Sequence, residues 1–193
     1  RFNTYFHTER PELLPNGDVL WLSERDGWQH IYRYGPDGML KNRLTEGAWH
    51  VDGIESIDVD EGVVYFTANG REEGEDPYYD HLYRVRLDGS DLRLLNPGNA
   101  DHSAEMSESG RFFVDNHSRV DTVPASVLRD ADGNIVTELQ TADMSGLDEA
   151  GWTMPETFSV KAADGVTDLY GVLYKPADFD STKHYPIVTY VYP

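Results

Sequence analysis

The sequence predicts a mainly β fold with, at its centre, a partial β-propeller of about three four-stranded blades. Apolar runs are short, either alternating with polar residues or β-branched, and Gly, Asp, Asn and Pro interrupt them, which is typical of proteins with many strands and turns. Helical periodicity is nearly absent. A pattern of strands and turns also recurs roughly every 45–50 residues, the repeat length of a propeller blade.

Each repeat begins at a Gly turn and continues through an apolar strand, a polar loop, a second strand, a turn containing Gly and a short strand. The opening glycines are Gly17, Gly62 and Gly110, and the later turn glycines are Gly38, Gly89 and Gly133. The segments HIYRY (His30–Tyr34) and HLYRV (His81–Val85) match almost letter for letter. The remaining strand precedes the opening glycine, and we expect two such strands at Asp52–Val59 and His102–Glu108. A ring usually has roughly four to eight blades, so these blades are expected to belong to a larger one.

The blade rhythm stops near Asp143, and we expect a propeller domain over residues 1–150 and a linker and second domain over 151–193. A hairpin follows, with its turn at Asp164-Gly165. The last segment, Pro186–Tyr192, is β-branched and aromatic without charge, which predicts a strand buried on both faces of a parallel sheet. Because such a strand needs neighbours and the sequence does not start with Met, a piece of a longer protein is expected.

Composition restricts the classes of partner. The chain has 16 basic and 35 acidic residues, for a formal net charge of −19. Nucleic acids and anionic membranes bind basic surfaces, so neither is expected as a partner. No apolar stretch approaches the roughly 20 residues of a membrane-spanning helix. The chain has no cysteine, which excludes disulfides and thiolate chemistry within these residues.

Two groups of side chains resemble reactive sites, and for both we favour a structural role. Ser23 lies close to acids in the segment SERDGW, but Asp26-Gly27 is a strong hairpin signal and the nearest base, His30, lies on the following strand. The 7 histidines show no metal-ligand spacing, and His30 and His81 recur at equivalent blade positions. We therefore expect neither a metal nor a cofactor.

Several segments together resemble the prolyl oligopeptidase family of serine peptidases, most closely its dipeptidyl peptidase IV subfamily. They are Leu20–Tyr34 (LWLSERDGWQHIYRY), Leu44–Asp58 (LTEGAWHVDGIESID), Val63–Asn69 (VVYFTAN), His81–Val85 (HLYRV) and Leu169–Pro193 (LYGVLYKPADFDSTKHYPIVTYVYP). The resemblance implies that the propeller leads into an α/β-hydrolase domain. The hairpin and the last strand are then its opening strands.

The resemblance also implies a serine exopeptidase that releases Xaa-Pro or Xaa-Ala dipeptides from peptide substrates through an acyl-enzyme, with the propeller gating access. These residues contain no Gly-x-Ser-x-Gly nucleophile elbow, and the family's triad residues are expected to lie beyond residue 193, so the chain alone should be inactive. One catalytic role is implied here: the hydroxyl of Tyr192, at the end of the last strand, would stabilise the oxyanion. Pro193 departs from the family, which has small residues after this Tyr.

Two alternatives stay open. A non-catalytic propeller used as a binding scaffold is one, although it leaves Thr157–Pro193 unexplained. The other is the specificity of acylaminoacyl peptidase or prolyl oligopeptidase, because the groups that set specificity lie outside these residues. The bacterial periplasm or secretion is the expected location, with the cytoplasm as the alternative, and a homodimer is open for the full-length protein.

Overall fold

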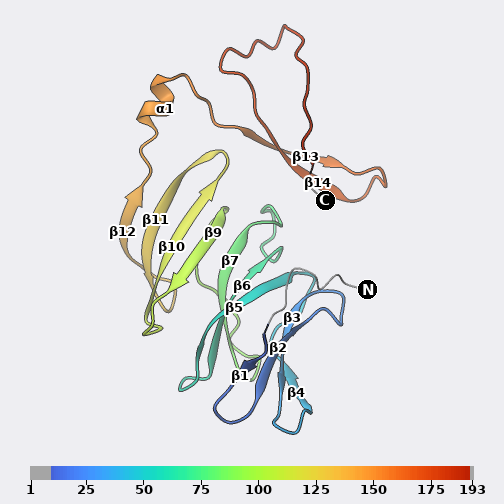
Figure 1. Cartoon of the computed structure of the whole chain (residues 1–193), viewed down its shortest axis with the longest axis vertical. Helices are drawn as coiled ribbons and strands as arrows, with labels where there is room; N and C mark the ends of the chain where they lie inside the picture. The colour runs from blue at the N-terminus through green and yellow to red at the C-terminus, as the bar shows by residue number, and fades with distance from the viewer. Residues whose placement is uncertain (1–9, 192–193) are drawn as a thin grey trace. The chain divides into compact units, whose positions relative to one another are not determined.

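The computed structural model describes residues 10–191, which form two compact units (Figure 1). The first unit contains the described residues up to Arg119 together with Val123–Ala142, and the second contains Val120–Thr122 and the described residues from Asp143 onward. The boundary between the two units lies after Ala142, near the point where the blade rhythm of the sequence stops. The assignment of residues 1–150 and 151–193 to two domains stays a prediction.

The first unit contains three four-stranded sheets whose strands neighbour one another in chain order. The first blade consists of β1 (Glu12–Leu13), β2 (Val19–Ser23), β3 (His30–Tyr34) and β4 (Leu40–Arg43). The second consists of β5 (His50–Asp58), β6 (Val63–Asn69), β7 (Asp80–Arg86) and β8 (Arg93–Leu94). The third consists of β9 (Asp101–Met106), β10 (Phe112–Arg119), β11 (Thr122–Asp130) and β12 (Ile135–Thr141). The predicted three blades are confirmed, including β5 and β9 before the opening glycines.

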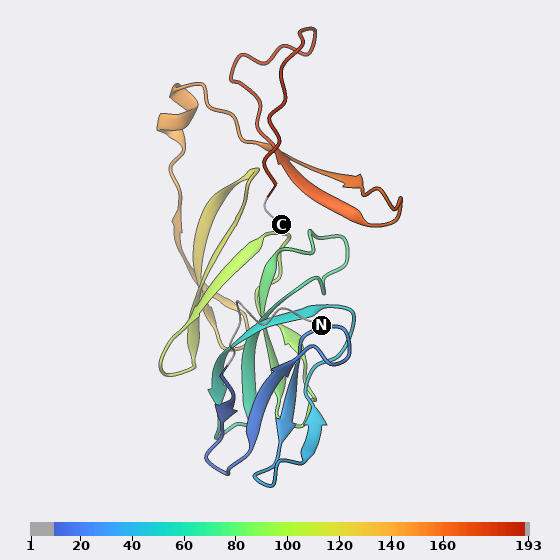
Figure 2. The same ribbon diagram turned by 45° about the vertical axis from the view of Figure 1, so that its right-hand side comes forward.

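The core of this unit lies at the two interfaces between consecutive blades. Successive side chains of a strand point to opposite faces, so β6 of the middle blade serves both interfaces. Val64 and Phe66 belong to the apolar cluster shared with blade one, whereas Val63 and Tyr65 pack in a second cluster with Phe113 of blade three. Strand β3 accordingly contacts β5, and β7 contacts β9, and the two views show the sheets in succession (Figures 1 and 2).

An aromatic stack fills the interface between the first two blades. Phe66 lies 6.3 Å from Trp49 and 5.6 Å from Tyr83, measured between ring centroids, and both pairs are nearly parallel. Trp49 and Tyr83 also stack on each other, at 6.3 Å. Phe66 and Tyr83 are fully buried. Large aromatic side chains bury much apolar area. The stack, which comes from blade two, belongs to the same buried cluster as Leu20 and Ile31 of blade one.

The first two blades share a side-chain hydrogen bond between their third strand and the residues that follow their last strand. The N–H of Ile31 donates to Thr45 Oγ1 at 3.1 Å, and the N–H of Leu82 donates to Asn96 Oδ1 at 2.8 Å. In each case the acceptor follows the last strand of the blade. The bond satisfies a buried backbone donor that the short strand leaves unpaired.

The second unit contains the predicted hairpin, formed by β13 (Glu156–Lys161) and β14 (Asp168–Leu173). Its turn is held by Asp164, whose Oδ1 accepts the N–H groups of Val166 and Thr167 at 2.9 Å. Gly165 takes a positive φ of 70°, which a residue with a side chain rarely adopts. A short helix, α1 (Ser145–Glu149), precedes the hairpin in the segment expected to be a linker.

The prediction of a buried strand over Pro186–Tyr192 is wrong for the described part of that segment. Residues 186–191 form no strand, and Val188 and Tyr190 are 92% and 87% exposed. A parallel strand needs neighbouring strands, and β13 and β14 pair with each other in a sheet of two. Residue 192 lies outside the described residues.

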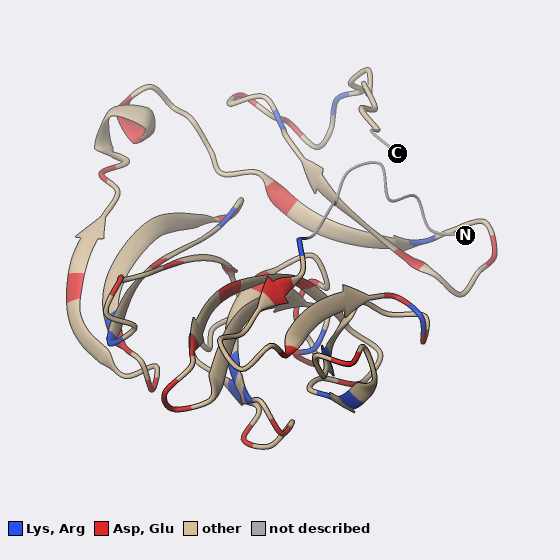
Figure 3. Ribbon diagram, turned by 60° about the horizontal axis from the view of Figure 1, so that its bottom comes forward, with Lys and Arg blue, Asp and Glu red and all other residues tan. Residues whose placement is uncertain are grey.

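The charge of the chain is spread over the blades. Acidic residues, which outnumber basic ones by 35 to 16, occupy many of the turns between strands (Figure 3). Within residues 10–191, no helix is long and apolar enough to cross a membrane.

Candidate functional site

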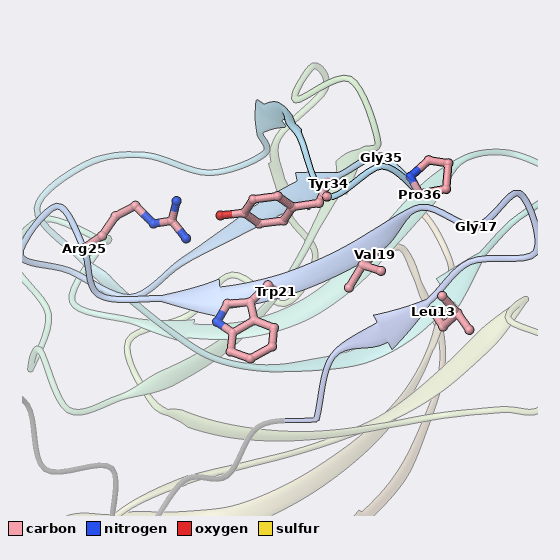
Figure 4. Close-up of a pocket in the computed structure, with 9 residues that line it drawn as sticks. Leu13, Gly17, Val19, Trp21, Arg25, Tyr34, Gly35 and Pro36 are labelled. Atoms are coloured by element: carbon pink, nitrogen blue, oxygen red, sulfur yellow. The ribbon is translucent and has the colours of Figure 1, made fainter.

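The outward face of blade one is an aromatic groove of about 500 Å³ (Figure 4). Its lining includes Leu13, Val19, Trp21, Arg25, Tyr34 and Pro36. Trp21 lies opposite Tyr32 in the strand pairing, as Phe66 lies opposite Tyr83 in blade two. Trp21 therefore occupies the position that Phe66 uses to dock blade two onto blade one, yet it is 46% exposed.

A cationic side chain lies at one end of this groove. The Arg25 guanidinium is 4.2 Å from the ring centroid of Tyr32 and 5.6 Å from that of Tyr34. A guanidinium over an aromatic face is attracted by the negative charge on that face of the ring. The outward face thus combines exposed apolar area with one positive charge.

The other face of blade one holds a buried ion pair. Asp18 is 1% exposed, and its two oxygens lie 2.6 Å from Arg33 Nη2 and 2.6 Å from Lys41 Nζ. Hydrogen bonding to Lys41 is the largest influence on the Asp18 pKa, and with Arg33 it outweighs the effect of burial and lowers that pKa. Asp18 is therefore ionised at neutral pH, and its role is structural.

The segment SERDGW has the structural role favoured from the sequence. Ser23 lies opposite His30 in the pairing of β2 with β3, but the ring nitrogens of His30 contact Thr45 Oγ1 and the Gly47 carbonyl, each at 3.0 Å. Burial lowers the pKa of His30, and both of its nitrogens are already engaged. Ser23 thus has no free base beside it.

A row of three histidine rings crosses from blade two to blade three. His81 on β7 lies 4.8 Å from His102 on β9, and His102 lies 5.4 Å from His117 on β10, measured between ring centroids. His102 and His117 are direct partners in the pairing of β9 with β10. His81 Nε2 contacts Glu75 Oε2 at 2.8 Å. The spacing in sequence gave no sign of this row, because strand pairing assembles it.

Asp115, which is fully buried, lies at the centre of this region. Its Oδ1 is 2.8 Å from His102 Nδ1 and 3.2 Å from Asn96 Nδ2, and its Oδ2 is 2.8 Å from Arg129 Nε. Burial alone would raise the pKa of Asp115, but His102, Arg129 and Asn96 together lower it. Asp115 is an ionised carboxylate held from three sides. Among the described residues, His102, Asp115 and His117 offer ligand atoms that all lie within 4.8 Å of one another.

A third acidic position lies where β7 begins. Asp80 accepts a hydrogen bond from Asn69 Nδ2 at 2.9 Å, and its own N–H donates to Asp101 Oδ1 at 3.0 Å. Burial raises the pKa of Asp80, and the negative charges of Asp52 and Asp101 add to this effect, although the Asn69 bond opposes it. Ionised Asp80 therefore lowers the stability of the folded protein.

The predicted catalytic residue, Tyr192, lies outside the described residues. The segment that leads to it lines a cavity of about 740 Å³ within the second unit, together with the end of β14. Apolar and aromatic side chains dominate the lining, among them Leu173, Phe179, Tyr185, Ile187 and Tyr190. Phe179 stacks on Tyr185 at 5.2 Å. This cavity has no acid, base or nucleophile in its lining apart from Lys175 and the tyrosine hydroxyls.

Comparison with known proteins gives consistent results. Residues 4–124 match the sequence model of the dipeptidyl peptidase IV (DPP IV) N-terminal region. The chain is 31% identical over 178 residues to a protein of Emericella nidulans named "Probable dipeptidyl-aminopeptidase B", covering 86% of this chain and 19% of that protein. It is 29% identical over 185 residues to dipeptidyl-aminopeptidase B of Aspergillus niger, covering 92% of this chain and 20% of that protein.

A solved structure is similar in fold. The crystal structure of Porphyromonas gingivalis dipeptidyl peptidase 4 superimposes with a TM-score of 0.71 and 25% identity, covering 91% of this chain and 24% of that one. The chain thus spans about a fifth of the curated relatives named above and about a quarter of this structure.

Three consecutive four-stranded blades define the first unit as part of a β-propeller region. The match to the sequence model covers well over half of the chain. This protein belongs to the dipeptidyl peptidase IV N-terminal region family.

Proposed function

We propose that this chain joins the propeller to the peptidase domain in a serine exopeptidase that releases Xaa-Pro or Xaa-Ala dipeptides from peptides. The observation that carries the proposal is the extent of similarity to dipeptidyl-aminopeptidases. At 86% of 193 residues, the alignment covers about 166 residues, more than the 142 that end with Ala142. Similarity therefore continues past the blades, which a free-standing propeller scaffold does not explain.

In this proposal the blades form part of a larger ring that limits which substrates reach the catalytic site. The outward face of blade one supports this view, because Trp21 and Tyr32 repeat the arrangement with which Phe66 and Tyr83 dock one blade on another. The expected occupant of the groove is a further blade of the same protein. Trp21→Asp should leave the stability of this chain unchanged within about 0.5 kcal/mol, as for exposed positions. In the full-length protein the same substitution should destabilise the propeller, and equal small effects in both would contradict the larger ring.

The proposed specificity is tested with the full-length protein. It should hydrolyse Gly-Pro-nitroanilide, whereas residues 1–193 alone should not, because these residues contain no nucleophile elbow. Preferential cleavage of N-terminally blocked peptides would move the assignment to acylaminoacyl peptidase or prolyl oligopeptidase specificity. No cleavage of either substrate by a folded full-length protein would favour the binding scaffold.

The proposed role of Tyr192 is tested by Tyr192→Phe in the full-length protein. Removing a single oxyanion donor costs about 10²–10³ in kcat. The KM should change little, since this hydrogen bond strengthens only as negative charge develops. A well-folded variant with wild-type kcat would leave Tyr192 a packing residue.

A further inference from the structure

We propose that His102, Asp115 and His117 bind a divalent transition-metal ion of the Zn²⁺ type, which joins β9 to β10 beside the interface of blades two and three. The three residues lie on one face, because His102 is the direct partner of His117 and Asp115 lies two residues before it. Two imidazoles and a carboxylate form a ligand set that such ions prefer, whereas Mg²⁺ and Ca²⁺ prefer oxygen ligands.

Both ring nitrogens of His102 face acceptor oxygens. Its Nε2 lies 3.1 Å from the Gly98 carbonyl oxygen and its Nδ1 lies 2.8 Å from Asp115 Oδ1. A carbonyl and an ionised carboxylate are both acceptors, so each nitrogen would have to donate. A neutral ring carries one N–H only, and with that N–H on Nε2 the lone pair of Nδ1 points at the carboxylate. A second proton removes this conflict without movement, and a metal ion bound by both atoms removes it once they separate from their hydrogen-bond distance of 2.8 Å.

The surroundings of His117 favour a bound metal ion over a second proton on His102. Its Nδ1 is buried and has no hydrogen-bond partner among the described residues. Leaving a buried polar atom without a partner is unfavourable, and a second proton on His102 does nothing for His117. His117 belongs to the same cluster of ligand atoms as His102 and Asp115. An ion that His117 binds through Nδ1 gives this nitrogen a partner, and one ion then resolves both defects.

The surrounding groups resemble the outer shell of a metal site. A metal-binding histidine usually donates its other ring N–H to a carbonyl or carboxylate, which fixes the ring. His102 has the Gly98 carbonyl in this position. Arg129 binds Oδ2 of Asp115. Oδ1 therefore faces the ion, although it also accepts a hydrogen bond from Asn96 Nδ2 at 3.2 Å. N and O ligands lie about 2.0–2.2 Å from Zn²⁺, so two of them can be at most about 4.4 Å apart. The three ligand atoms lie within 4.8 Å of one another, so they have to move closer together when an ion binds.

The cluster also has a path for an ion. His117 lines a cavity of about 200 Å³ on blade three, together with polar side chains of β9, β10 and β11 that include Asp101, Ser103 and Asn116. His102 and Asp115 are buried, at 4% and 0% exposure. Entry is therefore past His117, which makes His117 the ligand whose loss disturbs the buried network least.

The experiment measures Zn²⁺ binding to the chelator-treated protein by isothermal titration calorimetry, with Co²⁺ absorption as a second readout. The wild-type protein should bind one Zn²⁺ per chain and show no comparable binding of Mg²⁺. His117→Ala should weaken Zn²⁺ binding by at least about tenfold, since even outer-shell partners contribute about 10–100-fold. The matched control is His184→Ala, which removes an exposed histidine of the second unit and should retain wild-type affinity. Should His117→Ala fail to fold, His117→Gln keeps a polar side chain of similar size.

Three results would overturn the proposal. One is the absence of saturable Zn²⁺ binding by the folded wild-type protein. Another is equal affinity in the folded His117 variants and the wild type, which would place the ion elsewhere. The third comes from ¹⁵N NMR of the imidazoles at saturating Zn²⁺: a doubly protonated His102 ring would show that a proton occupies the position between Nδ1 and Asp115.

Discussion

Replacing Phe66 by alanine tests whether the interface between the first two blades holds the first unit together. The side chain is fully buried and stacks on both Trp49 and Tyr83. A buried Phe→Ala substitution costs about 3–5 kcal/mol through lost transfer free energy and the cavity left behind. Two aromatic contacts at about 0.5–1.5 kcal/mol each place Phe66→Ala toward the upper part of that range.

Thermal denaturation followed by tryptophan fluorescence measures this loss, and Trp49 is a reporter that contacts the mutated ring. For a chain of this length, each kcal/mol lowers Tm by about 2–4 °C, so the expected drop is about 6–20 °C. Phe112→Ala is the matched control, because this phenylalanine in β10 is 36% exposed and should cost no more than about 1 kcal/mol. Equal losses in the two variants, or a loss below about 1 kcal/mol for Phe66→Ala, would refute the assignment of the core to this interface.

Four further substitutions, one of them a control, test local features by denaturation. Asp80→Asn should stabilise the protein at pH 7 by up to about 1 kcal/mol. The gain should shrink below about pH 4, because the raised pKa of Asp80 makes its charge costly only above the unfolded value. Asp18→Asn should do the reverse, destabilising at pH 7 and flattening the loss of stability in acid, because the Asp18 pKa is lowered on folding. Gly133→Ala should destabilise more than Gly110→Ala: both have positive φ, but a Cβ at Gly133 meets the Leu95 backbone and one at Gly110 meets nothing within 4 Å. A pH-independent effect of either aspartate variant, or equal losses for the two glycines, would contradict these assignments.

The blades were predictable because their signals are local. The apolar run Val63–Asn69 and the turn at Gly62 are properties of adjacent residues, and the 45–50 residue recurrence repeats them. The histidine row was not predictable, since His102 and His117 are far apart in sequence and meet only through the register of β9 and β10. A search for ligand spacing along the chain does not detect residues on two strands.

The segment before Tyr192 shows a different limit of prediction from sequence. Its composition predicts a buried strand, but burial depends on partners rather than on composition. In the structure Val188 is exposed, because β13 and β14 pair only with each other. The intrinsic preference of such a run for strand is weaker than the need for neighbours. The sequence thus indicates that this segment can form a strand beside suitable neighbours, but it does not indicate the contacts of the segment in this structure.

The equivalence of Trp21 with Phe66 has a consequence for how such proteins change over evolutionary time. Since alternate side chains of one strand meet the preceding blade and the following blade, as Phe66 and Tyr65 do in β6, any whole repeat carries both halves of the interface. A tandem gene duplication of one repeat would insert a unit that already fits its two neighbours. Loss of part of a repeat would instead leave one face without its counterpart. Blade number is therefore free to change in whole units, while the boundaries of those units are constrained.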